Sequence, residues 1–229
     1  MVKSSSGLSA FLGNYVSEHK KELIEQVLEQ RTRALTVVLE DIYHPHNASA
    51  VVRSCDCFGI QDVHVIEDRN NYNINPKVVQ GSNKWVDLKK YTGDGNNTKV
   101  CFDKLKKDGY LLIGTSPDKS YPSIDDFELN GKTALVFGTE KTGISNYALD
   151  NVDALVHIPM AGFTESFNIS VCAAICLHSI RGKMKNDSFD WHLTDDEKDV
   201  LRLEWYKKVV HRSEVLERKY EMLKKDGKI

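Results

Sequence analysis

Apolar runs alternate with amphipathic stretches along much of the chain, and this alternation predicts an α/β fold. Strands are expected where short runs rich in apolar and β-branched residues occur, at 35–42, 62–67, 85–91, 110–115, 133–137 and 154–158. Apolar positions at helical spacing, or long apolar stretches, predict helices at 47–58, 98–107 and 168–184. Strands that alternate with helices favour one mainly parallel sheet with helices on both faces.

The two ends of the chain are expected to be helical extensions of this central domain. Residues 15–30 carry an amphipathic stripe, and a second helix should run from Thr194, capped with Glu197 at its third position, toward Lys225. The Asn-rich stretch 69–83 is expected to be an irregular loop. We therefore predict one domain in three parts: an N-terminal extension (1–33), the central domain (34–186) and a C-terminal extension (187–229).

Charge is distributed unevenly, although the formal net charge of the 229 residues is only −2. Residues 205–229 hold eight Lys or Arg against four acidic residues, whereas residues 34–204 hold 18 against 25. A basic C-terminal segment on an acidic body is compatible with an RNA contact, and a solvated helix face explains it equally well.

The composition favours a protein of the cytoplasm without membrane segments or metal. No run approaches the roughly 20 apolar residues of a membrane span, and the N-terminal stretch is too short and broken for a secretory signal. An odd number of cysteines, mostly within apolar patterns, indicates reduced thiols. No zinc-like spacing of ligands appears among them or the nearby histidines, so we expect no metal. The cysteines are Cys55, Cys57, Cys101, Cys172 and Cys176.

A glycine-bracketed segment, FGTEKTGIS, follows the fifth predicted strand. Gly138 and Gly143 would let backbone N–H groups approach a ligand around Glu140. An ordinary strand-to-helix turn would look the same. The pattern is neither the dinucleotide-binding GxGxxG nor the phosphate-binding loop of ATPases and GTPases.

Two further segments carry polar side chains beside apolar elements. In IPMAGFTESFNIS, Glu165, Ser166 and Asn168 stand just before the most apolar helix, which they either cap or equip as a site. Asn47 is placed to cap the helix 47–58, and Arg53 lies within that helix, where it needs an anionic partner or forms a simple ion pair.

Taken in this order, the three segments resemble those of the SPOUT methyltransferases of the SpoU/TrmH branch. The matching residues are Asn47 with Arg53, the run 137–145, and 158–160 with 166–170, and the resemblance covers about residues 33–185. It implies a parallel α/β sheet whose C-terminal part forms a deep trefoil knot, a rare topology. The opening LTVVLEDIYHPHNASAVVRSCDCFG is similar to that of enzymes that methylate the 2′-hydroxyl of guanosine 18 in tRNA.

The resemblance also implies a cofactor, S-adenosylmethionine, and a role for particular residues. The cofactor-contacting positions would be Thr115, Gly138, Glu140, Ile158, Met160 and Phe167. The catalytic set would be Arg53, Asn47, Glu140, Ser166 and Asn168. The tRNA would be gripped by Arg31 and Arg33 and by Lys207, Lys208 and Arg212.

Homodimerisation is expected from the same resemblance and agrees with the nearly all-apolar stretch 168–184. Two alternatives stay open at this point. One is a 23S ribosomal RNA 2′-O-methyltransferase of the same branch, and the other is an RNA-binding or assembly protein without catalytic activity.

Overall fold

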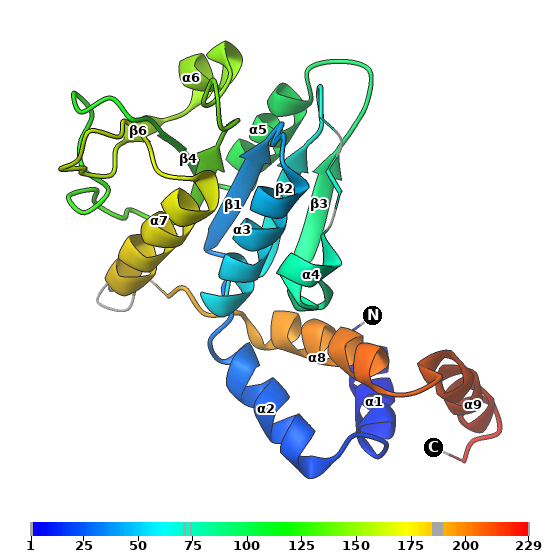
Figure 1. Ribbon diagram of the computed structural model, residues 1–229. Coiled ribbons are helices and arrows are strands. Elements are labelled where there is room, and N and C mark those ends of the chain that lie inside the picture. The colour runs from blue at the N-terminus through cyan, green and yellow to red at the C-terminus, as the bar shows by residue number, and fades with distance from the viewer. Residues whose placement is uncertain (1, 71, 74, 185–189, 229) are drawn as a thin grey trace. The chain divides into compact units, whose positions relative to one another are not determined.

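The computed structural model describes residues 2–70, 72–73, 75–184 and 190–228, and it divides into two compact units (Figure 1). One unit is continuous and spans Thr32–Trp191, and the other combines Met1–Arg31 with His192–Ile229. The two terminal segments, predicted as separate extensions with boundaries at 33/34 and 186/187, therefore pack together as one unit.

The central unit contains a six-stranded sheet in which every neighbouring pair of strands is parallel. The order across the sheet is β3-β2-β1-β5-β4-β6. This confirms the predicted α/β class and all six strand positions. The strands are β1 (Leu35–Glu40), β2 (Asp62–Ile66), β3 (Asp87–Tyr91), β4 (Leu111–Thr115), β5 (Thr133–Phe137) and β6 (Ala154–Val156).

Alternate residues of the strands feed two separate cores, one on each face of the sheet. In β1, Leu35, Val37 and Leu39 point into the larger core, whereas Val38 points into the smaller one. The larger core is covered by α3 (Pro45–Cys57), α4 (Pro76–Val79) and α7 (Ile169–Met184), and the smaller by α5 (Asn97–Lys107) and α6 (Asn146–Asn151) (Figure 1). Helices on both faces explain why β1, β2 and β5 are buried along their whole length.

Two local predictions in this unit are corrected. Helix α3 begins at Pro45 with His44 as N-cap, so Asn47 is not the cap. Proline has no N–H to leave unpaired and its fixed φ suits the first turn. The helix therefore begins earlier in the chain than predicted. The stretch 69–83 is not wholly irregular, because it contains α4 and the start of the 3-10 turn η1 (Ser82–Lys84).

The described residues of the second unit form four helices: α1 (Val2–Gly13), α2 (Glu18–Leu28), α8 (Asp195–Val209) and α9 (Ser213–Lys225). The capping box of Thr194 and Glu197 is confirmed. The single C-terminal helix predicted from Thr194 onward is instead broken, because Arg212 has a φ of 53°, which a helix cannot continue through. In the described part of the chain, no helix is both long and apolar enough to cross a bilayer.

Candidate functional site

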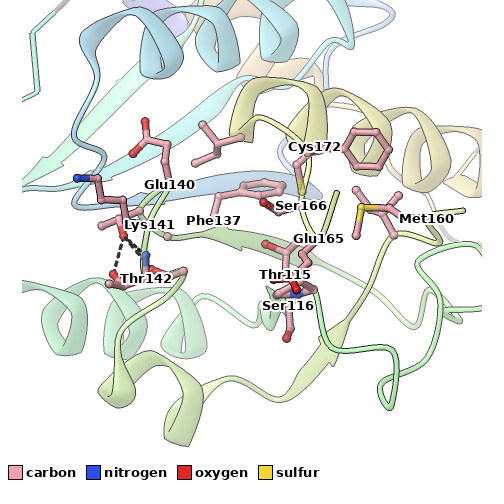
Figure 2. Close-up of a pocket in the computed structure, with 17 residues that line it drawn as sticks. Thr115, Ser116, Phe137, Glu140, Lys141, Thr142, Met160, Glu165, Ser166 and Cys172 are labelled. Atoms are coloured by element: carbon pink, nitrogen blue, oxygen red, sulfur yellow. Dashed lines mark hydrogen bonds between the residues drawn. The ribbon is translucent and has the colours of Figure 1, made fainter. Parts of the chain in front are cut away.

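A cavity of about 330 Å³ opens at the carboxyl ends of β4, β5 and β6, the edge where ligands bind in open parallel sheets (Figure 2). Its walls come from three connections: the residues after β4, the loop after β5 and the segment between β6 and α7. Lining residues are Thr115, Ser116, Pro117, Phe137, Gly138, Thr139, Glu140, Lys141, Thr142, Gly143, Ile158, Met160, Glu165, Ser166, Phe167, Ile169 and Cys172.

The loop after β5 closes on itself. The N–H of Thr139 donates to the Gly143 carbonyl at 2.9 Å, and the Gly143 N–H donates to the Thr139 carbonyl at 3.0 Å. Gly143 has a φ of 71°, a conformation that favours glycine. A side chain on Gly138 would overlap the backbone of Gly143 and Ile144. The two glycines thus give this wall of the cavity its shape through close packing within the loop. The approach of a ligand to the backbone N–H groups beside them stays a prediction.

A chain of amide and carboxylate groups joins the three sequence segments. The Asn47 side-chain amide donates to Glu140 Oε1 at 2.7 Å, and that of Asn168 donates to Asn47 Oδ1 at 3.2 Å. Asn168 also accepts the backbone N–H of Ser170 at 2.9 Å, so it both starts α7 and takes part in the site. Glu140 Oε2 is buried with no hydrogen-bond partner in the described part of the chain.

The structure brings together most of the predicted site residues. All six positions expected to contact the cofactor line the cavity, as does Ser166, and Asn47 and Asn168 are linked to its wall through Glu140. Arg53 is the exception. It lies six residues after Asn47, about 120° around the helix, and it is exposed. No hydrogen bond joins it to Asn47 or Glu140 in the described residues, so this chain alone does not bring Arg53 into the site.

The cavity includes residues that the sequence interpretation did not select. Ser116 extends β4, and Cys172 lies one helical turn after Asn168 on α7, a spacing that could have indicated it. A hydrogen bond with Cys176 lowers the pKa of the Cys172 thiol, and the same contact raises the pKa of Cys176. Cys172, interpreted from sequence as a core residue, therefore borders the cavity.

The lining groups carry both signs of charge beside apolar side chains. Figure 2 shows Glu140 and Lys141 on the loop after β5, and Glu165 and Ser166 near Thr115. Ile158, Met160 and Phe167 supply apolar surface. This combination suits a ligand with an apolar ring and charged groups. Among the described residues, no group of three or more His, Cys, Asp or Glu is arranged to hold a metal ion.

The two N-terminal arginines do not form the exposed basic patch predicted for them. Arg31 is 1% exposed and its guanidinium lies 5.4 Å from the ring centre of Trp205. Arg33 is ion-paired with Asp62 and with Asp87. Arg31 is thus buried and Arg33 is held between two carboxylates. An RNA contact at these two residues stays a prediction. In the helical unit, Lys208 and Arg212 are exposed, while Lys207 pairs with Glu217 at 2.6 Å.

The fold and the site together define an α/β protein with a cavity for a small ligand at the carboxyl ends of a parallel sheet. Comparison with known proteins places it further. The model of the SpoU rRNA methylase family matches residues 34–178. The chain belongs to this family.

Relatives and solved structures extend the likeness beyond the matched segment. The chain is 42% identical over 206 residues to the tRNA (guanosine(18)-2′-O)-methyltransferase of Borreliella burgdorferi, covering 90% of this chain and 93% of the relative. It is 32% identical to the enzyme of that name from Thermus thermophilus, and the match covers 79% of this chain and 92% of the relative. The A. aeolicus TrmH/SpoU tRNA modifying enzyme superposes with a TM-score of 0.72 at 28% identity, covering 85% and 98%.

Proposed function

We propose that this protein transfers a methyl group from S-adenosylmethionine to a ribose 2′-hydroxyl of tRNA, that of guanosine 18. One observation carries the proposal: three segments distant in sequence, each similar to a family motif, converge on one cavity of about 330 Å³. The chain matches two relatives over more than nine-tenths of their length, and both are named tRNA (guanosine(18)-2′-O)-methyltransferase. These names support the choice of tRNA as substrate.

The residues of the cavity fit S-adenosylmethionine, which supplies an electrophilic methyl group when bound. The unpartnered Glu140 Oε2 offers an acceptor for a donor on the ligand, and the Glu165 side chain adds negative charge toward its cationic groups. Lys141 provides a counter-charge for a carboxylate, while Ile158, Met160 and Phe167 can flank an adenine ring. Main-chain N–H groups of the loop 138–145 would read its polar edge.

The ribose would lie beside Ser166, which lines the cavity, and Asn168, which is linked to the cavity wall through Asn47 and Glu140. Positioning the 2′-oxygen in line with the methyl group should supply much of the rate. We assign Arg53 to the phosphate and ribose of the substrate as a bidentate clamp. A guanidinium has a pKa above about 12, which makes it a poor base near neutral pH.

We propose further that the enzyme is a homodimer in which Arg53 acts on the site of the second copy. Arg53 is exposed on α3, which packs against α7. Phe163, Phe167 and Val171 expose apolar surface in and just before α7. A second copy would cover this surface and bring in the missing arginine.

The proposed trefoil knot would involve the connection between β4 and β5. The Lys183 ammonium on α7 donates to the carbonyls of Ile124 and Phe127 in that connection, at 2.9 and 2.6 Å. Ser123 bridges to His157 just after β6. These contacts support a path in which the segment leading to α7 passes through the loop formed by that connection.

We assign Lys207, Lys208 and Arg212 to the tRNA backbone and place the enzyme in the cytoplasm, where its substrate would be met. Phosphate contacts of this kind position RNA without reading sequence.

The direct test uses labelled S-adenosylmethionine and two substrates, a tRNA transcript and a 23S ribosomal RNA fragment. Label confined to tRNA, with the modified nucleoside at guanosine 18, is expected. Label in the ribosomal fragment alone would replace the proposal by the ribosomal alternative. Failure of calorimetry to detect S-adenosylmethionine binding would favour a non-catalytic RNA-binding protein.

A further inference from the structure

Glu40 is a buried carboxylate outside the cavity for which the proposed reaction has no role. It is the last residue of β1 and only 3% exposed. It shares the face of β1 with Val38, so it points toward α5 and the smaller core. A buried carboxylate requires compensating hydrogen bonds, and its partners indicate what it holds in place.

Three donors converge on the Glu40 carboxylate. Oε1 accepts the Ser145 hydroxyl at 2.7 Å and the Thr98 hydroxyl at 2.7 Å, and Oε2 accepts the Ser145 backbone N–H at 2.8 Å. Two of the three come from Ser145, the residue that ends the loop after β5 and begins α6. The Ser145 hydroxyl also accepts the Ala148 N–H at 3.1 Å, so the same side chain caps that helix.

The loop that Glu40 holds is the one that forms a wall of the cavity. Its hydrogen bonds between Thr139 and Gly143 are internal, so they fix its shape and not its place. Its placement relies on Asn47 bound to Glu140 near the start of the loop and on Glu40 bound to Ser145 at the end. Both anchors come from the single segment 40–47.

We infer that Glu40 is a positioning residue that fixes the loop 138–145 and thereby sets the affinity for S-adenosylmethionine. This inference rests on the proposed function for its ligand. Glu40 does not line the cavity, so it acts only through Ser145. The loop supplies Gly138, Glu140 and Lys141 to the site, and loss of its second anchor would leave these groups in several arrangements, of which few bind.

Two variants of Glu40 separate the role of its hydrogen bonds from that of its charge. Glu40→Ala removes all three acceptors. Glu40→Gln can keep them, because its amide NH₂ can donate to the Thr98 and Ser145 hydroxyls while its carbonyl accepts the Ser145 N–H. A hydroxyl can turn to accept, so the glutamine variant should rescue most of the affinity.

Asp62→Ala provides the matched control. Asp62 is as buried as Glu40, at 2% exposed. It is the first residue of β2, so it lies at the amino ends of the strands, away from the cavity, and it pairs with Arg33 and Lys89. Its loss should lower the melting temperature without moving the cofactor-binding loop.

The experiment combines calorimetry of S-adenosylmethionine binding with hydrogen exchange of the ligand-free protein. Glu40→Ala is expected to weaken binding about tenfold or more and to speed amide exchange at 139–145, while the KM for tRNA stays near wild type. Asp62→Ala should keep the wild-type dissociation constant. If Glu40→Ala shows the wild-type rate of amide exchange at 139–145, the inference is overturned, whether or not the protein binds S-adenosylmethionine. If the wild-type protein does not bind S-adenosylmethionine, that separate result refutes the proposed function.

Discussion

Replacing Gly138 by alanine tests whether the close approach of Gly138 to Gly143 shapes the ligand cavity. The added methyl group would overlap the carbonyl group of Gly143 and the nitrogen of Ile144, which are backbone atoms and cannot turn aside as a side chain would. Relief requires the loop to open. Opening breaks the two hydrogen bonds between Thr139 and Gly143, at 2.9 and 3.0 Å.

The magnitude follows from those two bonds. Each contributes about 0.5–1.5 kcal/mol, so the variant loses about 1–3 kcal/mol of the free energy that holds the loop in its binding shape. That penalty corresponds to S-adenosylmethionine binding weakened by about 5- to 150-fold. Calorimetric titration of the purified variant measures the dissociation constant directly.

Gly182→Ala is the control for the same chemical change at another place. Gly182 lies in α7, and beyond the helix's own backbone no described residue comes within 4 Å of an added methyl group, so alanine should stabilise the helix by up to about 1 kcal/mol and leave the affinity unchanged. Wild-type affinity in Gly138→Ala would refute the link between the glycine contact and the cavity.

Three other changes have expected outcomes. Arg53→Lys keeps the charge but loses the planar fork, so turnover should fall about tenfold or more in a methylation assay while S-adenosylmethionine affinity holds; undiminished turnover would exclude a bidentate clamp. Burial lowers the pKa of His64 from 6.5 to about 4, so below pH 6.5 the unfolded chain takes up a proton that the folded chain does not. Stability should therefore fall as the pH drops from 6.5 toward 4, by up to about 3 kcal/mol, and urea unfolding of His64→Phe should show a shallower decline than wild type. Glu25→Gln breaks the half-exposed pair between Glu25 and Arg202 of the helical unit and should reduce the free energy of unfolding by less than about 1 kcal/mol, a larger loss in urea titration indicating that the pair is not screened as assumed.

Local patterns predicted the sheet well because both of its faces are covered by helices. Runs such as Thr133–Phe137 are buried along their whole length, which leaves a continuous apolar signal. The helix α1 was not predicted, since VKSSSGLSAFLG is rich in serine and contains two glycines, residues of low helix propensity. The structure supplies a tertiary reason: a side chain on Gly7 would collide with the Tyr220 hydroxyl, so glycine lets α1 approach α9 closely.

Motifs in the sequence predicted which residues form the site, but they could not predict the contacts among those residues. Asn47 was interpreted as a helix cap, whereas its amide bridges Glu140 and Asn168, residues 93 and 121 positions away. Arg31 looked like a surface cation and is buried beside Trp205. Neither outcome has a local signal, because each depends on which distant segment the fold brings alongside.

The helical unit is built from both ends of the chain, and this affects the order in which the protein can form during synthesis. Residues 32–191 are continuous and leave the ribosome together, so their sheet can assemble early. Helix α1 is made before the central unit, yet it packs against α8 and α9, which are made after that unit. Helices α1 and α2 therefore stay without these partners until the central unit has been synthesised. A chain released before α8 is made would carry a formed central unit with α1 and α2 exposed to proteases.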